Sequence, residues 1–224
     1  MIAEIGSTTM NISFALYFIV YIPQILHNQK PQNIAQLSLW LHFLLYISCF
    51  FDLLYGVTNR LPWQYQIVST VTLTLVSIQH LQLINYFMHQ QRALLVSILT
   101  AVLIFNLALL YCFFKLAHGV LDTKIVFVIG VIARLFGIVY CLPQLMKNNV
   151  LKAANGMSTY FIYLNLSLAL LDTISSWCLD WGWPNKIAAP INIVIMLSIL
   201  WQTKKYDCLH KKTEEFTAYM ASAK

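Results

Sequence analysis

The sequence has very little charge for its length. Only 10% of its 224 residues are Asp, Glu, Lys or Arg, whereas 59% are hydrophobic. An ordinary soluble domain carries about a quarter charged residues, and so little charge could not cover a globule of this size. The composition therefore excludes a typical soluble protein and indicates a chain that lies within a lipid bilayer.

Patterns that bind metals or carry catalysis are also lacking. The five cysteines are scattered, mostly inside apolar runs, with no CxxC pair and no His/Cys cluster. We therefore expect packing cysteines rather than a disulfide framework or a metal site. The sequence also lacks HExxH, a paired aspartate motif and a Ser/His constellation, so we expect neither an enzyme nor a bound cofactor.

Positive charge is nearly absent from the start of the chain. The first ten residues, MIAEIGSTTM, contain no Lys or Arg, so we expect a retained membrane span rather than a cleaved signal peptide. The formal net charge of +6 is concentrated toward the C-terminus. We interpret it as a signal for membrane topology and expect no nucleic-acid partner.

Seven apolar runs are long enough to cross a bilayer, which takes about 20 residues each. The loops between them are short, so the sequence predicts an all-α membrane protein with seven transmembrane helices and no inserted soluble domain. The expected spans are Ile12–His27, Gln36–Val57, Gln64–Met88, Ala93–Phe114, Thr123–Met146, Met157–Leu179 and Asn185–Thr203.

The distribution of Lys and Arg predicts the orientation. With the N-terminus outside, the inner loops hold nine of these residues and the outer loops four, and basic residues favour the cytoplasmic side. We expect an outside or lumenal N-terminus and a cytoplasmic C-terminus. The membrane would be the inner membrane in a bacterium, or a lysosomal or other endomembrane in a eukaryote. Both a monomer and a homo-oligomer are compatible with the sequence.

An internal repeat organises the spans. Shifting the chain by 120 residues aligns spans 1, 2 and 3 with spans 5, 6 and 7, and the polar matches include Pro23/Pro143, Gln24/Gln144 and Asp52/Asp172. Three helices end on the opposite side of the membrane from where they began. A single linker helix brings the chain back, so both three-helix units have the same orientation. The sequence therefore predicts two parallel three-helix bundles (12–88 and 123–203), a linker helix (93–114) and a basic cytoplasmic tail (204–224).

A Pro-Gln pair near the end of an apolar run occurs in both copies, as Pro23-Gln24 and Pro143-Gln144. Proline lacks a backbone donor and clashes with the carbonyl four residues earlier, so we expect the carbonyls of Ile19 and Val139 to be freed. Such kinks persist in membranes where they line a cavity. The two pairs are therefore candidate hinges of an inner gate; the alternative is that each proline only bends its helix.

These pairs, in a three-plus-one-plus-three layout, resemble the PQ-loop family. That family includes cystinosin-like lysosomal transporters, SWEET sugar transporters and the KDEL receptor. SIQH (77–80) and LNLS (164–167) resemble elements of the cystinosin branch. The resemblance implies a membrane transporter for a small polar solute, an amino acid or a sugar, that works by alternating access and is either facilitative or proton-coupled. The alternative is a receptor or trafficking factor without transport.

The resemblance also suggests where a solute binds. Asn165 stands where cystinosin-like proteins carry a protonatable aspartate, and Asn192 and Trp177 occupy roughly the positions of sugar-binding residues in SWEET transporters. At about 1.5 Å per residue, Asn165 and His80 reach similar depths near mid-membrane. We expect these four residues to ring a central pocket. Alternatively, the two asparagines hold helices together and His80 is a packing residue or a proton carrier.

Three charged residues fall inside the expected spans. Arg134 and Asp172 lie at nearly the same estimated depth, and a buried charge needs a partner, so we expect them to pair. The pair would be a static structural link, or Asp172 would act as an outer-gate or coupling acid. Asp52, the repeat equivalent of Asp172, would be a proton site if buried, or would lie at the wet outer rim.

The C-terminal tail carries a further short motif. Tyr206-Asp207-Cys208-Leu209 resembles the lysosomal sorting motif near the cystinosin C-terminus. The surrounding lysines have a simpler interpretation, as basic residues that fix the tail on the cytoplasmic side.

Overall fold

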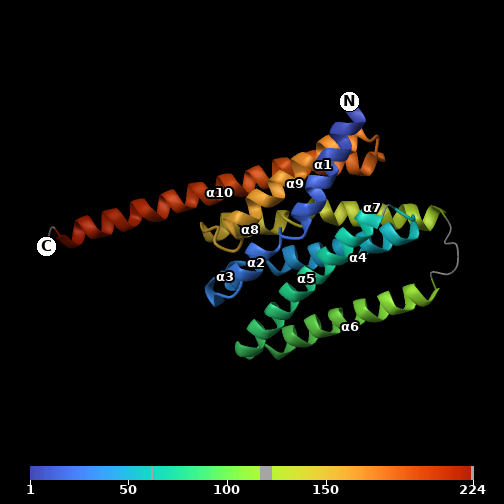
Figure 1. Ribbon diagram of the computed structural model, residues 1–224. Coiled ribbons are helices and arrows are strands. Elements are labelled where there is room, and N and C mark those ends of the chain that lie inside the picture. Colours follow the sequence, from blue (N-terminus) through green and yellow to red (C-terminus); the bar gives the residue numbers. More distant parts are fainter. Residues whose placement is uncertain (62, 117–122, 223–224) are drawn as a thin grey trace.

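The computed structural model describes residues 1–61, 63–116 and 123–222, and its secondary structure there is helical (Figure 1). In chain order the helices are α1 (Ile2–Tyr17), α2 (Ile22–His27), α3 (Pro31–Gln36), α4 (Leu39–Thr58), α5 (Trp63–His89), α6 (Ala93–Leu116), α7 (Thr123–Val139), α8 (Leu142–Leu151), α9 (Thr159–Cys178) and α10 (Trp183–Ser222).

Six stretches of the described chain are long and apolar enough to cross a membrane. They are Ile2–His27, Leu39–Thr58, Trp63–His89, Lys124–Leu151, Thr159–Cys178 and Asn185–Cys208. Each overlaps one expected span, so the protein is an all-helical, multi-pass membrane protein. The remaining expected span, 93–114, falls in α6, whose described apolar part, Ala93–Ala108, is shorter than these six.

Two helices extend beyond the ranges expected from the sequence. The first helix begins at Ile2 instead of residue 12, so most of the MIAEIGSTTM segment is helical. The last helix, α10, continues without interruption to Ser222, through most of the predicted basic tail.

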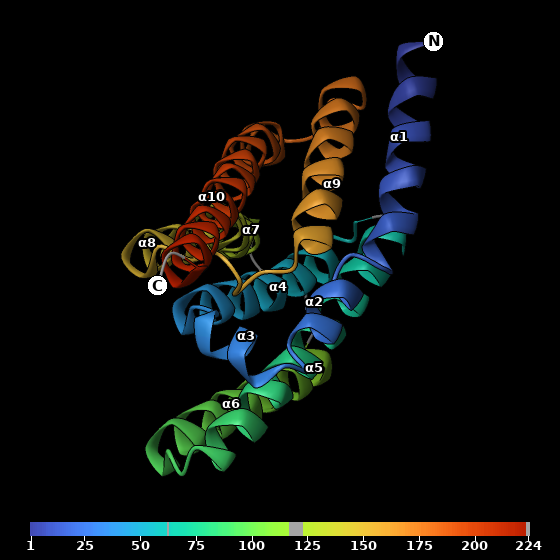
Figure 2. The same ribbon diagram turned by 90° about the vertical axis from the view of Figure 1, so that its left-hand side faces the viewer.

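The two halves of the chain interlock instead of standing apart (Figure 2). In each half the second and third membrane helices pack together, as α4 with α5 and α9 with α10. Across the halves, α1 packs on α9 and α7 packs on α4. These cross-half contacts are equivalent under the 120-residue shift, so the first helix of each half lies on the second helix of the other. Helix α6 packs on α5.

The contact between α4 and α7 is very close because small residues of α7 face α4 there. A Cβ atom on Gly130 would lie 2.7 Å from the ring of Tyr55, and one on Gly137 would lie 3.0 Å from Ser48 Oγ. The Ser48 hydroxyl also donates a hydrogen bond of 3.0 Å to the carbonyl of Ala133. This close packing brings the inner face of α7 next to the polar residues of α4.

Both Pro-Gln segments lie at breaks between helices. Helix α1 ends at Tyr17 and α2 begins at Ile22, while α7 ends at Val139 and α8 begins at Leu142. Each proline therefore stands in the first turn of a new helix, where its missing N–H costs little. The expected free carbonyl at Ile19 is wrong, because the N–H of Ile22 donates to it at 3.1 Å.

Candidate functional site

A cavity of about 660 Å³ lies between the two halves of the chain. Its lining comes from α1, α4, α5, α7, α9 and α10, so both halves contribute. It extends from the α4–α5 and α9–α10 connections, at Asn59 and Trp181, to Tyr21 and Tyr140 beside the Pro-Gln segments. The cavity therefore runs from these two connections to the two helix breaks.

Beyond the cavity, Gln24 of the first Pro-Gln segment links the two halves of the chain by hydrogen bonds. Its amide Nε2 donates to the carbonyl of Gly156 at 3.1 Å, and its Oε1 accepts from the N–H of Ser158 at 2.8 Å. Both partners belong to the loop that precedes α9 in the other half. The same amide also donates to Asn28 Oδ1 at 2.8 Å, which fixes its orientation.

The second segment repeats these contacts through Gln144. Its Nε2 donates to the carbonyl of Gln36 at 3.1 Å, and its Oε1 accepts from the N–H of Ser38 at 2.7 Å. It also donates to Asn148 Oδ1 at 2.8 Å. Every one of these partners is 120 residues from its counterpart in the first set. We call the two sets together the Pro-Gln seal.

A second pair of cross-half contacts flanks the Pro-Gln seal. His27 Nε2 lies 2.8 Å from the carbonyl of Asn155, and Lys147 Nζ donates to the carbonyl of Ala35 at 2.8 Å. These positions are again repeat equivalents, although the side chains differ. At this end of the molecule, therefore, the duplicated geometry survives even where the residue type does not.

One hydrogen bond of the seal is formed in the second half alone. Asn148 Nδ2 donates to Gln202 Oε1 at 3.0 Å, whereas the equivalent atoms, Asn28 Nδ2 and Gln82 Oε1, are both buried without a partner among the described residues. The first half thus carries two amide atoms without described partners at the positions where the second half has a hydrogen bond.

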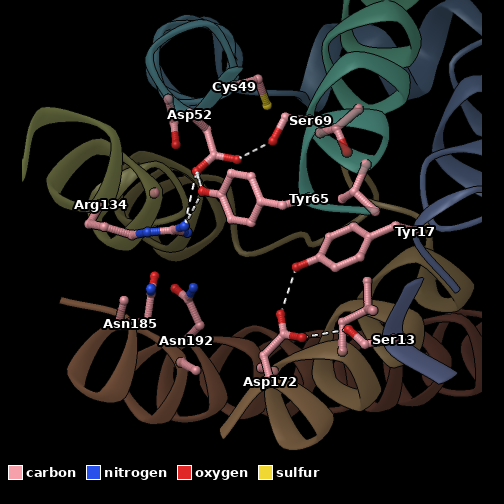
Figure 3. A pocket seen from close by; sticks show the side chains of 18 of the residues that line it. Ser13, Tyr17, Cys49, Asp52, Tyr65, Ser69, Arg134, Asp172, Asn185 and Asn192 are labelled. Atoms are coloured by element: carbon pink, nitrogen blue, oxygen red, sulfur yellow. Dashed lines mark hydrogen bonds and ion pairs between the residues drawn. The ribbon is translucent and has the colours of Figure 1, made fainter. Parts of the chain in front are cut away.

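The cavity wall formed by α4, α5 and α7 contains an ion pair. Arg134 Nη2 lies 3.1 Å from Asp52 Oδ1. Tyr65 donates to the same carboxylate at 2.5 Å and also accepts a hydrogen bond from Arg134, while Ser69 donates to the other carboxylate oxygen at 2.8 Å. Asp52 is therefore a compensated charge (Figure 3).

The opposite wall contains the repeat-equivalent carboxylate in neutral surroundings. Asp172 accepts hydrogen bonds from Ser13 at 2.5 Å and from Tyr17 at 2.6 Å, one on each oxygen. The expected pairing of Arg134 with Asp172 is wrong, because Arg134 lies on α7 and α7 packs on α4, the helix of Asp52. Among the described residues, the hydrogen-bond partners of the Asp172 carboxylate are these two hydroxyls.

Two of the four expected binding residues line the cavity. Asn165 donates from Nδ2 to the carbonyl of Phe161 at 2.9 Å, and Asn192 has a buried Oδ1 without a partner among the described residues. The repeat equivalent of Asn192 is Thr72, which also lines the cavity and whose Oγ1 is likewise buried and unpartnered. Polar atoms without partners therefore occur at equivalent points on both sides of the cavity.

The other two expected binding residues are not part of the cavity lining. His80 is buried between α4 and α6, with Nδ1 at 2.9 Å from His42 Nε2 and Nε2 at 2.9 Å from the carbonyl of Leu99. Trp177 is 55% exposed on the outer face of α9, where the Lys186 ammonium lies over its ring. The expected ring of four residues is therefore wrong for His80 and Trp177.

Among the described residues, no group of three or more His, Cys, Asp or Glu side chains is arranged to hold a metal ion.

Tyr206, the first residue of the possible sorting motif, lies outside the cavity. It is buried and donates to Asn149 Oδ1 at 2.7 Å. Its hydroxyl thus links α10 to α8 instead of facing the solvent.

The connection between α9 and α10 is held by an ion pair at the rim. Asp180, which is exposed, accepts a hydrogen bond from the Lys186 ammonium, and this contact lowers the pKa of the Asp180 carboxyl. Asp180 itself does not line the cavity.

Sequence reasoning did not single out several residues that define the site, namely Ser13, Tyr17, Tyr65, Ser69 and Thr72. The 120-residue shift would have revealed Thr72, since it takes Asn192 directly to position 72. Ser13 and Tyr17 carry no such signal, because their equivalents, Ala133 and Gly137, are not polar. Their role follows from the packing of α1 on α9.

Comparison with known proteins addresses the first half of the chain. The family model described as "PQ loop repeat" matches residues 5–65, which cover most of α1, all of α2 to α4 and the first Pro-Gln segment. No curated protein sequence matches the chain. The matched repeat, the second copy of its hydrogen bonds 120 residues later and the candidate membrane spans agree with one another and support assignment of the chain to the PQ-loop repeat proteins.

Proposed function

We propose that this protein is a membrane transporter that moves a small polar solute, an amino acid or a sugar, by alternating access. The observation that carries the proposal is a cavity between two repeat-related halves, lined by apolar and polar side chains, that ends at the helix breaks where the Pro-Gln seal links the two halves. Its volume of about 660 Å³ lies within the range of small-molecule sites, roughly 300–1,000 Å³.

The proposed topology has seven spans, with α6 as the linker between two parallel three-helix bundles. Hydrogen bonds that repeat after 120 residues support two like-oriented units, and α6 makes its contacts at the edge of the first unit, on α5. With the N-terminus outside or in a lumen, the α4–α5 and α9–α10 connections lie on the side away from the cytoplasm. The Pro-Gln seal then lies on the cytoplasmic side.

The helix breaks support a hinge at each Pro-Gln segment. Around Pro23 and Pro143 the regular helical hydrogen bonds are already interrupted, so bending there disrupts fewer bonds than bending a continuous helix. In the proposed cycle, solute enters the open end, the cavity closes above it, and the contacts of Gln24 and Gln144 with the other half are released. The solute then leaves toward the cytoplasm.

Protons are candidate partners for this cycle because two carboxylates, Asp52 and Asp172, line the cavity. Facilitative transport is the alternative. The two mechanisms differ in whether a pH gradient drives accumulation of the solute above its external concentration.

Solute uptake into proteoliposomes tests the proposal. The purified full-length chain is reconstituted, and uptake of radiolabelled amino acids and sugars is measured with and without a pH gradient, against protein-free liposomes. We expect saturable uptake of at least one solute and its loss in a Gln24→Ala/Gln144→Ala variant. If the folded protein moves no solute but binds a peptide or protein ligand, the receptor alternative replaces transport.

A further inference from the structure

We propose that the cavity selects a solute of net positive charge over a zwitterion, that the cationic end of this solute is an ammonium or guanidinium group with N–H donors, and that Asp172 is its anchor. This inference rests on the proposed function to the extent that the cavity is the solute site. Neutral sugars and anions would then be poor ligands of the same cavity.

The charge balance of the cavity is the first step. The charged residues among its described lining are Asp52, Arg134 and Asp172. Arg134 lies 3.1 Å from Asp52 and compensates it, which leaves the Asp172 carboxylate as an unbalanced negative charge. A charge inside a membrane protein is costly without a partner, so a cationic ligand gains from supplying one.

The hydrogen-bonding capacity of the same wall is the second step. Each oxygen of Asp172 accepts one hydroxyl, from Ser13 or from Tyr17, and an ionised carboxylate oxygen can accept a further donor. Nearby on α10, Asn192 presents a buried carbonyl oxygen that accepts nothing from the described residues. Both groups can accept further hydrogen bonds, and a ligand with several N–H groups provides the donors.

The opposite wall offers a complementary site for a hydroxyl or amine. Thr72 is only 8% exposed, and its Oγ1 has no partner among the described residues although it lines the cavity. An unpaired buried polar group costs about 1–3 kcal/mol, so such atoms in a cavity indicate where a ligand completes the bonding. Thr72 and Asn192 would hold the ligand from both sides.

The aromatic lining is the third step. Tyrosine and tryptophan faces attract cations, and several of them surround the cavity. Because Arg134 covers Asp52 on the α4–α7 side, the positive end of the ligand is directed to the α9–α10 side (Figure 3). The aromatic residues of the lining are Phe14, Tyr17, Tyr21, Tyr55, Tyr65, Tyr140 and Trp181.

Arginine and citrulline form the matched pair of probes, because they have nearly the same shape and differ in the charge of the side-chain end. Binding to the full-length protein in lipid nanodiscs is measured by calorimetry. We expect arginine to bind at least about tenfold more tightly than citrulline, since hydrogen bonds to a charged group are worth about 1.5–3 kcal/mol. Asp172→Asn should abolish that difference.

Asp52→Asn is the matched control, because it changes the cavity charge by the same amount at the repeat-equivalent position. We expect it to weaken arginine binding less than Asp172→Asn does. Asp180→Asn, which removes a carboxylate outside the cavity, should leave binding unchanged. Thermal unfolding of each variant establishes that it is folded.

Three results would overturn the inference: equal binding of arginine and citrulline by the unaltered protein, equal losses in Asp52→Asn and Asp172→Asn, or no binding of either probe. Uptake separates this failure from failure of the proposed function. If neutral solutes enter proteoliposomes while arginine neither binds nor enters, transport stands and cation selection is wrong. If arginine binds but no solute is moved, cation binding stands and transport is wrong.

Discussion

The two ends of the molecule treat the duplicated sequence differently. At the end with the Pro-Gln seal, Gln24 and Gln144 make the same hydrogen bonds with partners that differ by 120 residues. At the cavity end the equivalent positions have diverged. Asp52 forms an ion pair with Arg134, whereas Asp172 accepts hydrogen bonds from two hydroxyls. The repeat equivalent of Arg134 is Phe14, which cannot pair with a carboxylate.

This contrast separates what a repeat must keep from what it is free to change. Closing a path between two halves needs matching donors and acceptors on both sides, so the symmetric seal keeps its residues. A solute has no two-fold symmetry, so the two walls that contact it gain from being different. Thr72 opposite Asn192 and Leu45 opposite Asn165 are examples within the cavity.

The largest effect should come from removing the two glutamines one at a time. Gln24→Ala or Gln144→Ala leaves a buried N–H and a carbonyl of the other half unpaired, which costs about 3 kcal/mol and opens the seal about 150-fold more often. In a background that retains only Cys141, which is buried, labelling by an impermeant maleimide from the seal side measures opening. Clearly unequal effects of the two substitutions would show that the seal is symmetric in geometry but not in energy.

A smaller effect should follow from adding one methyl group at Gly156. Its Cβ would lie 2.5 Å from the carbonyl oxygen of Gln36 and 2.7 Å from Gln144 Nε2, and such overpacking costs about 2 kcal/mol. The same maleimide assay should show faster labelling of Cys141 in Gly156→Ala.

The matched control for this change lies at the equivalent position of the other half. Gln36→Ala keeps a Cβ that is already accommodated there and removes one hydrogen bond, from the N–H of Asn155 to Gln36 Oε1 at 3.2 Å. Labelling in Gln36→Ala as fast as in Gly156→Ala would contradict the steric explanation.

At the cavity end, removal of Arg134 should destabilise the protein by about 1–2 kcal/mol. Arg134→Met leaves the Asp52 carboxylate without its cation, and the effect is moderate because the two side chains are 27% and 22% exposed. Thermal unfolding should show a lower Tm, which the double variant Asp52→Asn/Arg134→Met partly restores. Failure of the double variant to recover would indicate that Arg134 stabilises the fold by packing instead of by charge.

The smallest expected effect is a difference in stability between equivalent substitutions in the two halves, Asn148→Ala and Asn28→Ala. Asn148→Ala removes the donor to Gln202, whereas Asn28→Ala removes an amide donor that has no partner. The other contact, with the preceding glutamine, is lost equally in both. Asn148→Ala should therefore cost about 1 kcal/mol more in thermal unfolding. Equal Tm values would mean that the Asn148–Gln202 bond contributes nothing to stability.

The sequence predicted the helical membrane fold and the repeat because both depend on regular patterns. Long apolar runs identify spans without any knowledge of packing, and the 120-residue shift fixes which residues are equivalent. The same shift pairs Gln24 with Gln144, which make matching hydrogen bonds, whereas their role in an inner gate stays a prediction. Asn165 and Asn192 were placed in the cavity from their depth and from the family resemblance.

Depth along a helix gave no information about direction around it, and the wrong expectations for Arg134, His80 and Trp177 share this cause. Arg134 and Asp172 match in depth, but α7 packs on α4, so Asp52 receives the arginine. His80 is as deep as Asn165 but points toward His42 and the linker helix. Which helix faces which depends on the interlocking of the two halves, and periodicity does not encode it.

The length of α10 has a mechanical consequence. The candidate span ends at Cys208, but the helix continues to Ser222, a further stretch of about 20 Å, and Tyr206 fastens it to α8 through Asn149. A tilt of the second bundle would therefore move the far end of α10 through a larger distance than its base. A fluorescent label near that end would make the tilting of a single bundle visible in real time.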